Sequence, residues 1–103
     1  MIRVLVESPF AGNLERNIAY ARKACLDCLQ RGEAPYASHL FFPQMLDDLK
    51  ENERALGIQA GLAWGGAAAK TVVYQDFGIT PGMQVGIETA IKLGRPVEYR
   101  RIL

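Results

Sequence analysis

The residues best suited to chemistry lie in the segment from Asp76 to Met83, where a loop leads into a predicted helix. Thr80 suits the cap of this helix, and Pro81 suits its first turn. Gly82 permits a close approach to the backbone, and the N-terminus of a helix attracts anions through its dipole and its free N–H groups. The segment therefore predicts phosphate contacts from Thr80, Gly82 and Met83, although a plainly capped helix fits the residues equally well.

A hydroxyl, an imidazole and a carboxylate could come together from Ser8, Ser38, His39 and Asp76, but their spacing does not require a catalytic triad. His39 is the single histidine, and we expect it to line a crevice rather than to bind a metal. A partly buried structural histidine is an equal alternative. The sequence contains no Walker loop, no Gly-x-Gly-x-x-Gly and no Gly-x-Ser-x-Gly, which argues against an ordinary ATP, dinucleotide or hydrolase site.

Cys25 and Cys28 have the spacing of a redox or zinc motif. A structural zinc site needs four ligands, and a redox pair usually sits at the start of a helix, whereas these residues fall late in a helical pattern. We therefore predict two small apolar side chains on one helix face, no metal and no cofactor. The acidic cluster from Asp47 to Glu53 is predicted to be a solvated helical face or loop for similar reasons.

The chain has 103 residues, of which 50% are hydrophobic, and this predicts one globular domain over residues 1–103. Twelve basic and eleven acidic residues leave a net charge of +1, so a nucleic-acid backbone is not an expected partner. The first residues lack the apolar run of an export signal, and no stretch has the length of a membrane span. We expect a cytoplasmic protein without a membrane partner.

Short strands alternate with helices along the chain. Strands are predicted at 2–6, 35–38, 71–74 and 96–99, and helices at 14–31, 55–64 and 81–93. This β-α-β-α-β-α-β order predicts a single-domain, three-layer α/β fold of the Rossmann-like kind, with a parallel sheet in the order 2-1-3-4. The ligand crevice of such a sheet lies at the carboxyl ends of the strands, which here are 7–13, 38–39 and 75–82.

Several segments together resemble one family. They are Ser8-Pro9-Phe10 after the first strand, Asn17 and Ala21 on the first helix, Ser38-His39 after the second strand, and the run from Gly78 to Val97. In order and spacing they resemble the nucleoside 2-deoxyribosyltransferase-like proteins, in particular the small members common in phages, over nearly the whole chain. The resemblance implies a flavodoxin-like parallel sheet and, for a phage protein, a place in the host cytoplasm.

The resemblance also implies a chemistry and a departure from it. The family's enzymes cleave or exchange an N-glycosidic bond through a covalent sugar on a Glu that lies six residues after the Ser or Asp opening the last helix. Thr80 matches the opening position and Ala90 a later Ala, but the Glu position is Gly86. Glu88 is the nearest acid, and a step of two residues turns it by about 200° around the helix. Whether the protein is an enzyme is therefore left open, with Glu88 as the candidate catalytic residue if it is.

The leading hypothesis is that the crevice binds a nucleotide-derived small molecule without turnover, as in nucleotide sequestration. One alternative is an N-glycosidase or deoxyribosyltransferase with a relocated acid, and another is a structural homo-oligomer with a vestigial site. Asp76 is expected to hold a ribose hydroxyl or the loop. A homo-oligomer is expected because Phe41, Phe42 and Trp64 are many large apolar residues for a short chain to bury. The ligand-binding residues are predicted to be Ser8, Pro9, Phe10, Asn13, His39, Asp76, Phe77, Thr80, Gly82, Met83 and Gly86.

Overall fold

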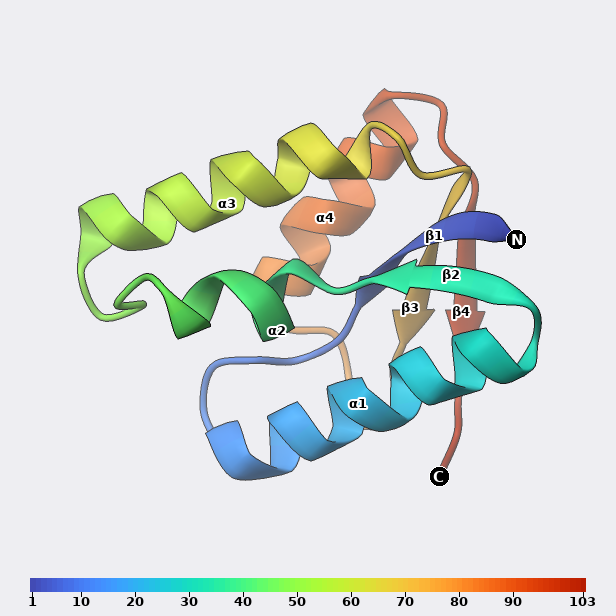
Figure 1. The fold of residues 1–103 in the computed structure, drawn as a ribbon, viewed down its shortest axis with the longest axis horizontal. Helices are drawn as coiled ribbons and strands as arrows, with labels where there is room; N and C mark the ends of the chain where they lie inside the picture. Colours follow the sequence, from blue (N-terminus) through green and yellow to red (C-terminus); the bar gives the residue numbers. More distant parts are fainter.

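The computed structural model describes all 103 residues as a four-stranded parallel sheet with helices on both faces (Figure 1). The strand order is β2-β1-β3-β4, so the predicted fold class and strand order are confirmed. Along the chain the elements are β1 (Ile2–Glu7), α1 (Leu14–Gln30), β2 (Glu33–Tyr36), α2 (Ser38–Phe41), the 3-10 turn η1 (Phe42–Gln44), α3 (Glu51–Gly65), β3 (Lys70–Tyr74), α4 (Pro81–Lys92) and β4 (Val97–Arg100). None of these helices is both long and apolar enough to cross a bilayer.

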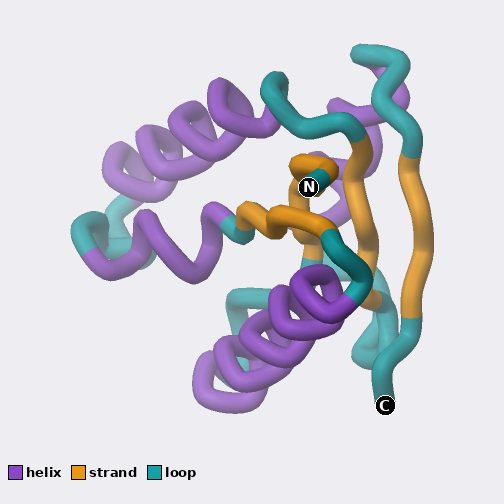
Figure 2. Tube along the Cα trace, turned by 45° about the vertical axis from the view of Figure 1, so that its right-hand side comes forward, coloured by secondary structure: helices purple, strands orange, loops and turns teal.

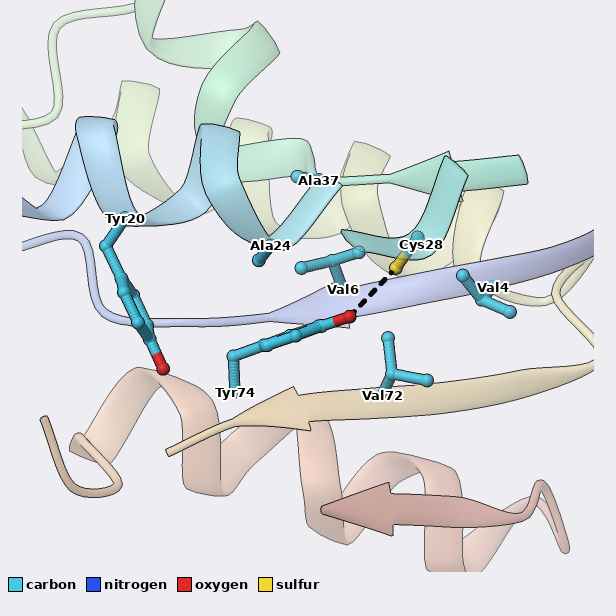
Figure 3. Close-up of a cluster of buried hydrophobic side chains, with 8 residues drawn as sticks. All are labelled: Val4, Val6, Tyr20, Ala24, Cys28, Ala37, Val72 and Tyr74. Carbon is cyan, nitrogen blue, oxygen red and sulfur yellow. Dashed lines mark hydrogen bonds between the residues drawn. The ribbon is translucent and has the colours of Figure 1, made fainter. Parts of the chain in front are cut away.

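Strand β1 is apolar at consecutive positions because both of its faces are covered. Val4 and Val6 point to the α1 side, where they pack in a cluster with α1 and β3 side chains (Figure 3). Leu5 lies against Gly65 of α3 on the opposite side. The cluster on the α1 side contains Val4, Val6, Tyr20, Ala24, Cys28, Ala37, Val72 and Tyr74. A smaller cluster of Val73, Met83 and Ile87 fixes α4 to the other face of the sheet.

Helix α1 forms where its capping and its apolar stripe predict it. The Asn13 side chain accepts a hydrogen bond from the backbone of Arg16 at 3.1 Å. The chain turns out of the helix at Gly32, whose φ of +80° favours glycine. Cys28 is buried and Cys25 packs against the same cluster, so the prediction of two small apolar side chains packed on one helix face is confirmed.

Two elements differ from their sequence-based bounds by more than one residue. Strand β2 covers Glu33–Tyr36 rather than 35–38, because the buried carboxylate of Glu33 is bound at the start of the strand by Arg100 and Lys70. Helix α3 begins at Glu51, four residues before the predicted start. Acidic side chains at Glu51 and Glu53 suit the positive end of a helix, and this part of the acidic cluster, predicted as a solvated helical face or loop, forms the first turn of α3.

Helices α2 and α3 lie side by side and extend beyond the sheet in both views (Figures 1 and 2). Only Gly61 and Gly65 of α3 are buried. Gly61 lies so close to Ser38 that a Cβ there would come within 2.9 Å of the serine side chain. Small residues thus bring α3 against α2 and the end of β1, while its larger apolar side chains remain exposed.

Candidate functional site

A cavity of about 480 Å³ opens at the carboxyl end of the sheet, which is where a parallel α/β fold is expected to bind its ligand. Its volume is within the usual range for small-molecule sites. The loop after β1, helix α2, the segment before α3, α3 itself and the start of α4 all contribute to its wall. The lining residues are Glu7, Ser8, Phe10, Ala11, Gly12, Ser38, His39, Asp48, Arg54, Ile58, Thr80, Pro81, Gly82 and Met83.

Ser8 and His39 form a hydrogen-bonded pair in this wall. The Ser8 Oγ lies 2.7 Å from His39 Nε2. Burial lowers the pKa of His39 to about 4, so the imidazole is neutral at pH 7 and its Nε2 can accept the serine proton. The ring of Phe10 meets His39 edge-on, with 6.3 Å between the ring centroids. The predicted place of His39 on the crevice agrees with this geometry.

Asp76 and Phe77 lie away from the cavity wall. Asp76 accepts hydrogen bonds from the Tyr20 hydroxyl at 2.6 Å and from the backbone N–H groups of Ile102 and Leu103. The Phe77 ring packs edge-on against the Tyr20 ring, with 4.8 Å between the ring centroids. Asp76 was expected either to bind a ribose hydroxyl or to hold the loop, and these contacts fit the second role. Asp76 does not form a triad with Ser8 and His39.

The start of α4 has the capped geometry that the sequence predicts. The Thr80 hydroxyl accepts a hydrogen bond from the Met83 N–H at 3.2 Å, and the Met83 side chain is buried. Pro81 has no N–H group, so in this turn Gly82 carries the N–H without a partner. An anion at this helix end would meet the Gly82 N–H and the Thr80 hydroxyl rather than the Met83 backbone.

The most unusual relationship in the site joins Glu7, the last residue of β1, to Gly86 on α4. The Glu7 carboxylate lies against the backbone of Gly86, where a Cβ would overlap its oxygen atoms. No donor is bonded to this carboxylate, and burial raises its pKa to about 7, although the positive charge of Arg95 lowers it. The Arg95 guanidinium is itself held by Thr71 Oγ1 at 2.9 Å and by the Gly65 carbonyl at 2.8 Å.

Sequence reasoning placed Glu7 at the carboxyl end of a strand but did not include it in the site. The sequence did contain a signal for Glu7. The family resemblance implies an acid at position 86, where this chain has glycine, and a carboxylate from a neighbouring element could lie beside that glycine instead. Glu88 is exposed and accepts a hydrogen bond from Gln84 at 3.2 Å, as its rotation around the helix predicts. The nearest carboxylate to Gly86 therefore comes from β1 and not from α4.

The structure brings Ser8, Phe10, His39, Thr80, Gly82 and Met83 together in the cavity wall, with Gly86 lining its continuation beside Glu7. Pro9 is buried, and Asn13 serves as the cap of α1. The segment from Ser38 to Ile58 adds residues that sequence reasoning did not select, among them Asp48 and Arg54. Their contribution depends on how α3 folds back over the sheet edge, which no local pattern predicts.

The fold and the position of its cavity define a Rossmann-like α/β protein with a candidate site at the carboxyl edge of the sheet. Residues 2–100 match the family described as Domain of unknown function (DUF7768), and the chain belongs to that family. No curated protein has a matching sequence.

Among solved structures, the fold is similar to that of a 2-deoxyribosyltransferase from the psychrotolerant bacterium Bacillus psychrosaccharolyticus. The TM-score is 0.69 and the sequences are 15% identical, over 96% of this chain and 72% of that chain. This likeness establishes a common fold.

Proposed function

We propose that the cavity binds a nucleoside or a nucleotide. The observation that carries this proposal is the cavity itself, which lies at the carboxyl ends of adjacent strands and combines an aromatic wall with polar groups. The solved structure with a similar fold is a 2-deoxyribosyltransferase, and this supports a nucleoside-derived ligand.

The lining suggests how such a ligand would be held. The flat ring of Phe10 suits a base, because aromatic rings stack on bases of any sequence. The Ser8 hydroxyl and His39 suit the hydroxyl groups of a sugar. The Gly82 N–H and the Thr80 hydroxyl suit the oxygen atoms of a phosphate at the positive end of α4.

Titration calorimetry with deoxynucleosides and their 5′-monophosphates tests this proposal. Native mass spectrometry of the purified protein adds a search for a ligand that is retained during purification. A Gly82→Leu variant, which fills the cavity beside Thr80, is expected to lose binding while its circular dichroism is unchanged. A Gly66→Leu variant alters an exposed glycine outside the cavity and serves as the matched control. Equal affinity in both variants would exclude this cavity as the site.

Glu7 bears on whether a bound ligand is retained or consumed. The expectation of binding without turnover rested on the missing carboxylate at Gly86, yet the Glu7 carboxylate lies against that glycine. Cleavage or exchange of an N-glycosidic bond is therefore the second candidate function, and this specific contact favours it.

We also propose that a second copy of the chain packs on α3. Leu56, Leu62 and Trp64 are exposed on this helix, with 66% of the Trp64 surface open to solvent. Exposed large apolar side chains on a small domain are typical of an interface. Because Arg54 and Ile58 of the same helix line the cavity, a copy packed on α3 would also close one side of the candidate site.

A further inference from the structure

We propose that Glu7 is the acid–base residue of the crevice and transfers a proton to and from the base of a bound nucleoside or nucleotide. This inference rests on the proposed function, because it needs such a ligand in the cavity. It assigns the reacting carboxyl group to β1, whereas the acid considered from the sequence was Glu88 on α4.

The Glu7 carboxylate has no bonded donor that would give it a structural role. A buried carboxylate that stabilises a fold is normally bonded to donors or paired with a cation. Glu33 shows this arrangement in the same protein. Its carboxylate accepts hydrogen bonds from the Arg100 guanidinium at 2.7 Å and 2.8 Å and forms an ion pair with Lys70 Nζ at 2.9 Å. These partners lower the pKa of Glu33 to about 2. The Glu7 carboxylate has no bonded donor, so burial opposes its ionisation. This burial therefore does not stabilise the fold in the way that the burial of Glu33 does.

The chain around Glu7 leaves room for its carboxyl group. Gly86 is buried in the middle of α4, where glycine costs roughly 1 kcal/mol of helix stability relative to alanine. Any side chain at this position would collide with the Glu7 carboxylate. Glu7 also lines the cavity directly, together with Ser8 and Thr80. The carboxyl group is thus placed where a ligand in the cavity would meet it.

The surroundings of Glu7 suit acid–base chemistry better than nucleophilic attack. A carboxylate that attacks a substrate should be ionised and held by donors, and Glu7 is neither bonded nor fully ionised at neutral pH. A carboxyl group with a pKa near 7 populates both protonation states and suits general acid–base catalysis. The other charged or titratable groups around it are His39 from α2, Asp48 and Arg54 from the segment around the start of α3, and Arg95 after α4.

The step can be written with all atoms accounted for, with water as the co-reactant. Protonated Glu7 gives its proton to the base as the bond between the sugar carbon and the base nitrogen breaks, and the bonding electrons leave with the base. A water molecule enters the place that the base vacates and forms the new bond to the sugar carbon. The proton that this water loses returns to the Glu7 carboxylate, so the products are free sugar and free base.

The test compares the wild-type protein with Glu7→Gln, using deoxynucleosides and their 5′-monophosphates as probes. Calorimetry measures binding, and chromatography measures free base. We expect Glu7→Gln to bind as the wild type does and to release base at least about 100-fold more slowly, which is the usual size of an acid–base contribution. The wild-type rate should fall as the pH rises above about 7, because the acid form of Glu7 is lost. Glu15→Gln, on an exposed residue of α1, is the matched control and should behave as the wild type does.

The possible failures are distinguishable. A wild-type protein that binds none of the probes would remove the proposed function and this inference with it. A wild-type protein that binds a probe and releases no base would overturn the inference alone, as would undiminished release by Glu7→Gln. Loss of release in Glu88→Gln but not in Glu7→Gln would assign the acid to α4 instead. If Glu7→Gln does not fold, Glu7→Ala replaces it, with the same expected loss.

Discussion

The carboxylate of Glu7, at the end of β1, occupies the space that a side chain on Gly86 of α4 would fill. The two residues are far apart in the sequence, and each explains why the other residue type stands at its position. The glycine leaves room for the carboxyl group, and the carboxyl group takes up room that would otherwise belong to the cavity.

This relationship predicts the effect of Gly86→Ala on the pKa of Glu7. The added Cβ would push the carboxylate, which is the end of a flexible side chain, out toward the cavity and solvent. Lower burial should then move its pKa from about 7 toward the ordinary value of 4.5. Carbon NMR of the glutamate carboxyl groups, assigned with Glu7→Gln, measures the shift. An unchanged pKa would show that the two residues are not in contact.

The pH dependence of stability gives a second prediction. Because the folded-state pKa of Glu7 is raised, the protein should lose stability as the pH rises from about 4.5 through about 7. Glu7→Gln removes this loss. The free energy of unfolding of the variant, relative to that of the wild type, should therefore rise by on the order of 3 kcal/mol between pH 4.5 and pH 8.

Urea unfolding of both proteins across this pH range measures the difference between them. His39 contributes in the opposite direction, since its pKa is lowered to about 4 and its contribution is lost as the pH falls from about 6.5. It is present in both proteins and largely cancels in the difference. A stability difference that does not vary with pH would contradict the assignment for Glu7.

The buried pair of Glu33 and Arg100 predicts a large loss of stability when one partner is removed. Arg100→Met leaves the Glu33 carboxylate with Lys70 alone. Such a change typically costs about 3–5 kcal/mol. The double variant Arg100→Met/Glu33→Gln should be more stable than Arg100→Met, because it leaves no buried charge uncompensated. Urea unfolding measures both, and a cost below about 1 kcal/mol for Arg100→Met would refute the predicted role of the pair.

The contacts of Asp76 predict a variant that separates folding from ligand binding. Asp76→Asn weakens the hydrogen bonds to Tyr20 and to the backbone of the C-terminal residues, and should lower the free energy of unfolding. Affinity for the probes should stay the same, because Asp76 does not line the cavity. A selective loss of affinity with unchanged stability would instead assign Asp76 to a ribose hydroxyl.

The exposed apolar side chains of α3 predict association in solution. Light scattering of the wild type should give at least twice the monomer mass of 11.4 kDa. Trp64→Glu places a charge in the proposed contact and should shift the population to monomer. A wild-type monomer at working concentration would exclude the interface.

The sequence was sufficient for the fold because its signals are local and mutually consistent. The apolar run of β1, the cap at Asn13 and the Thr80–Pro81 helix start each specify an element, and the alternation of strands and helices then restricts the topology. The boundary of β2 was missed because Glu33 is held by Arg100 from β4, which is a long-range contact.

The site was predictable only in part, for the same reason. Ser8, His39 and Gly82 follow strands or open a helix, so topology places them at the crevice. Neither Glu7 nor Gly86 indicates a site when it is considered alone. Their contact depends on the packing of α4 across β1, which the sequence does not show. Arg54 reaches the cavity through the path of α3, which glycine contacts with Ser38 and Leu5 determine.

A crystal structure of Glu7→Gln with a bound deoxynucleoside 5′-monophosphate tests the central claim most directly. We expect the ligand to lie in the cavity between Phe10 and Gly82, with the bond between sugar and base about 3–3.5 Å from the side chain at position 7. A ligand bound elsewhere on the protein, or one whose base lies beyond reach of position 7, would contradict it.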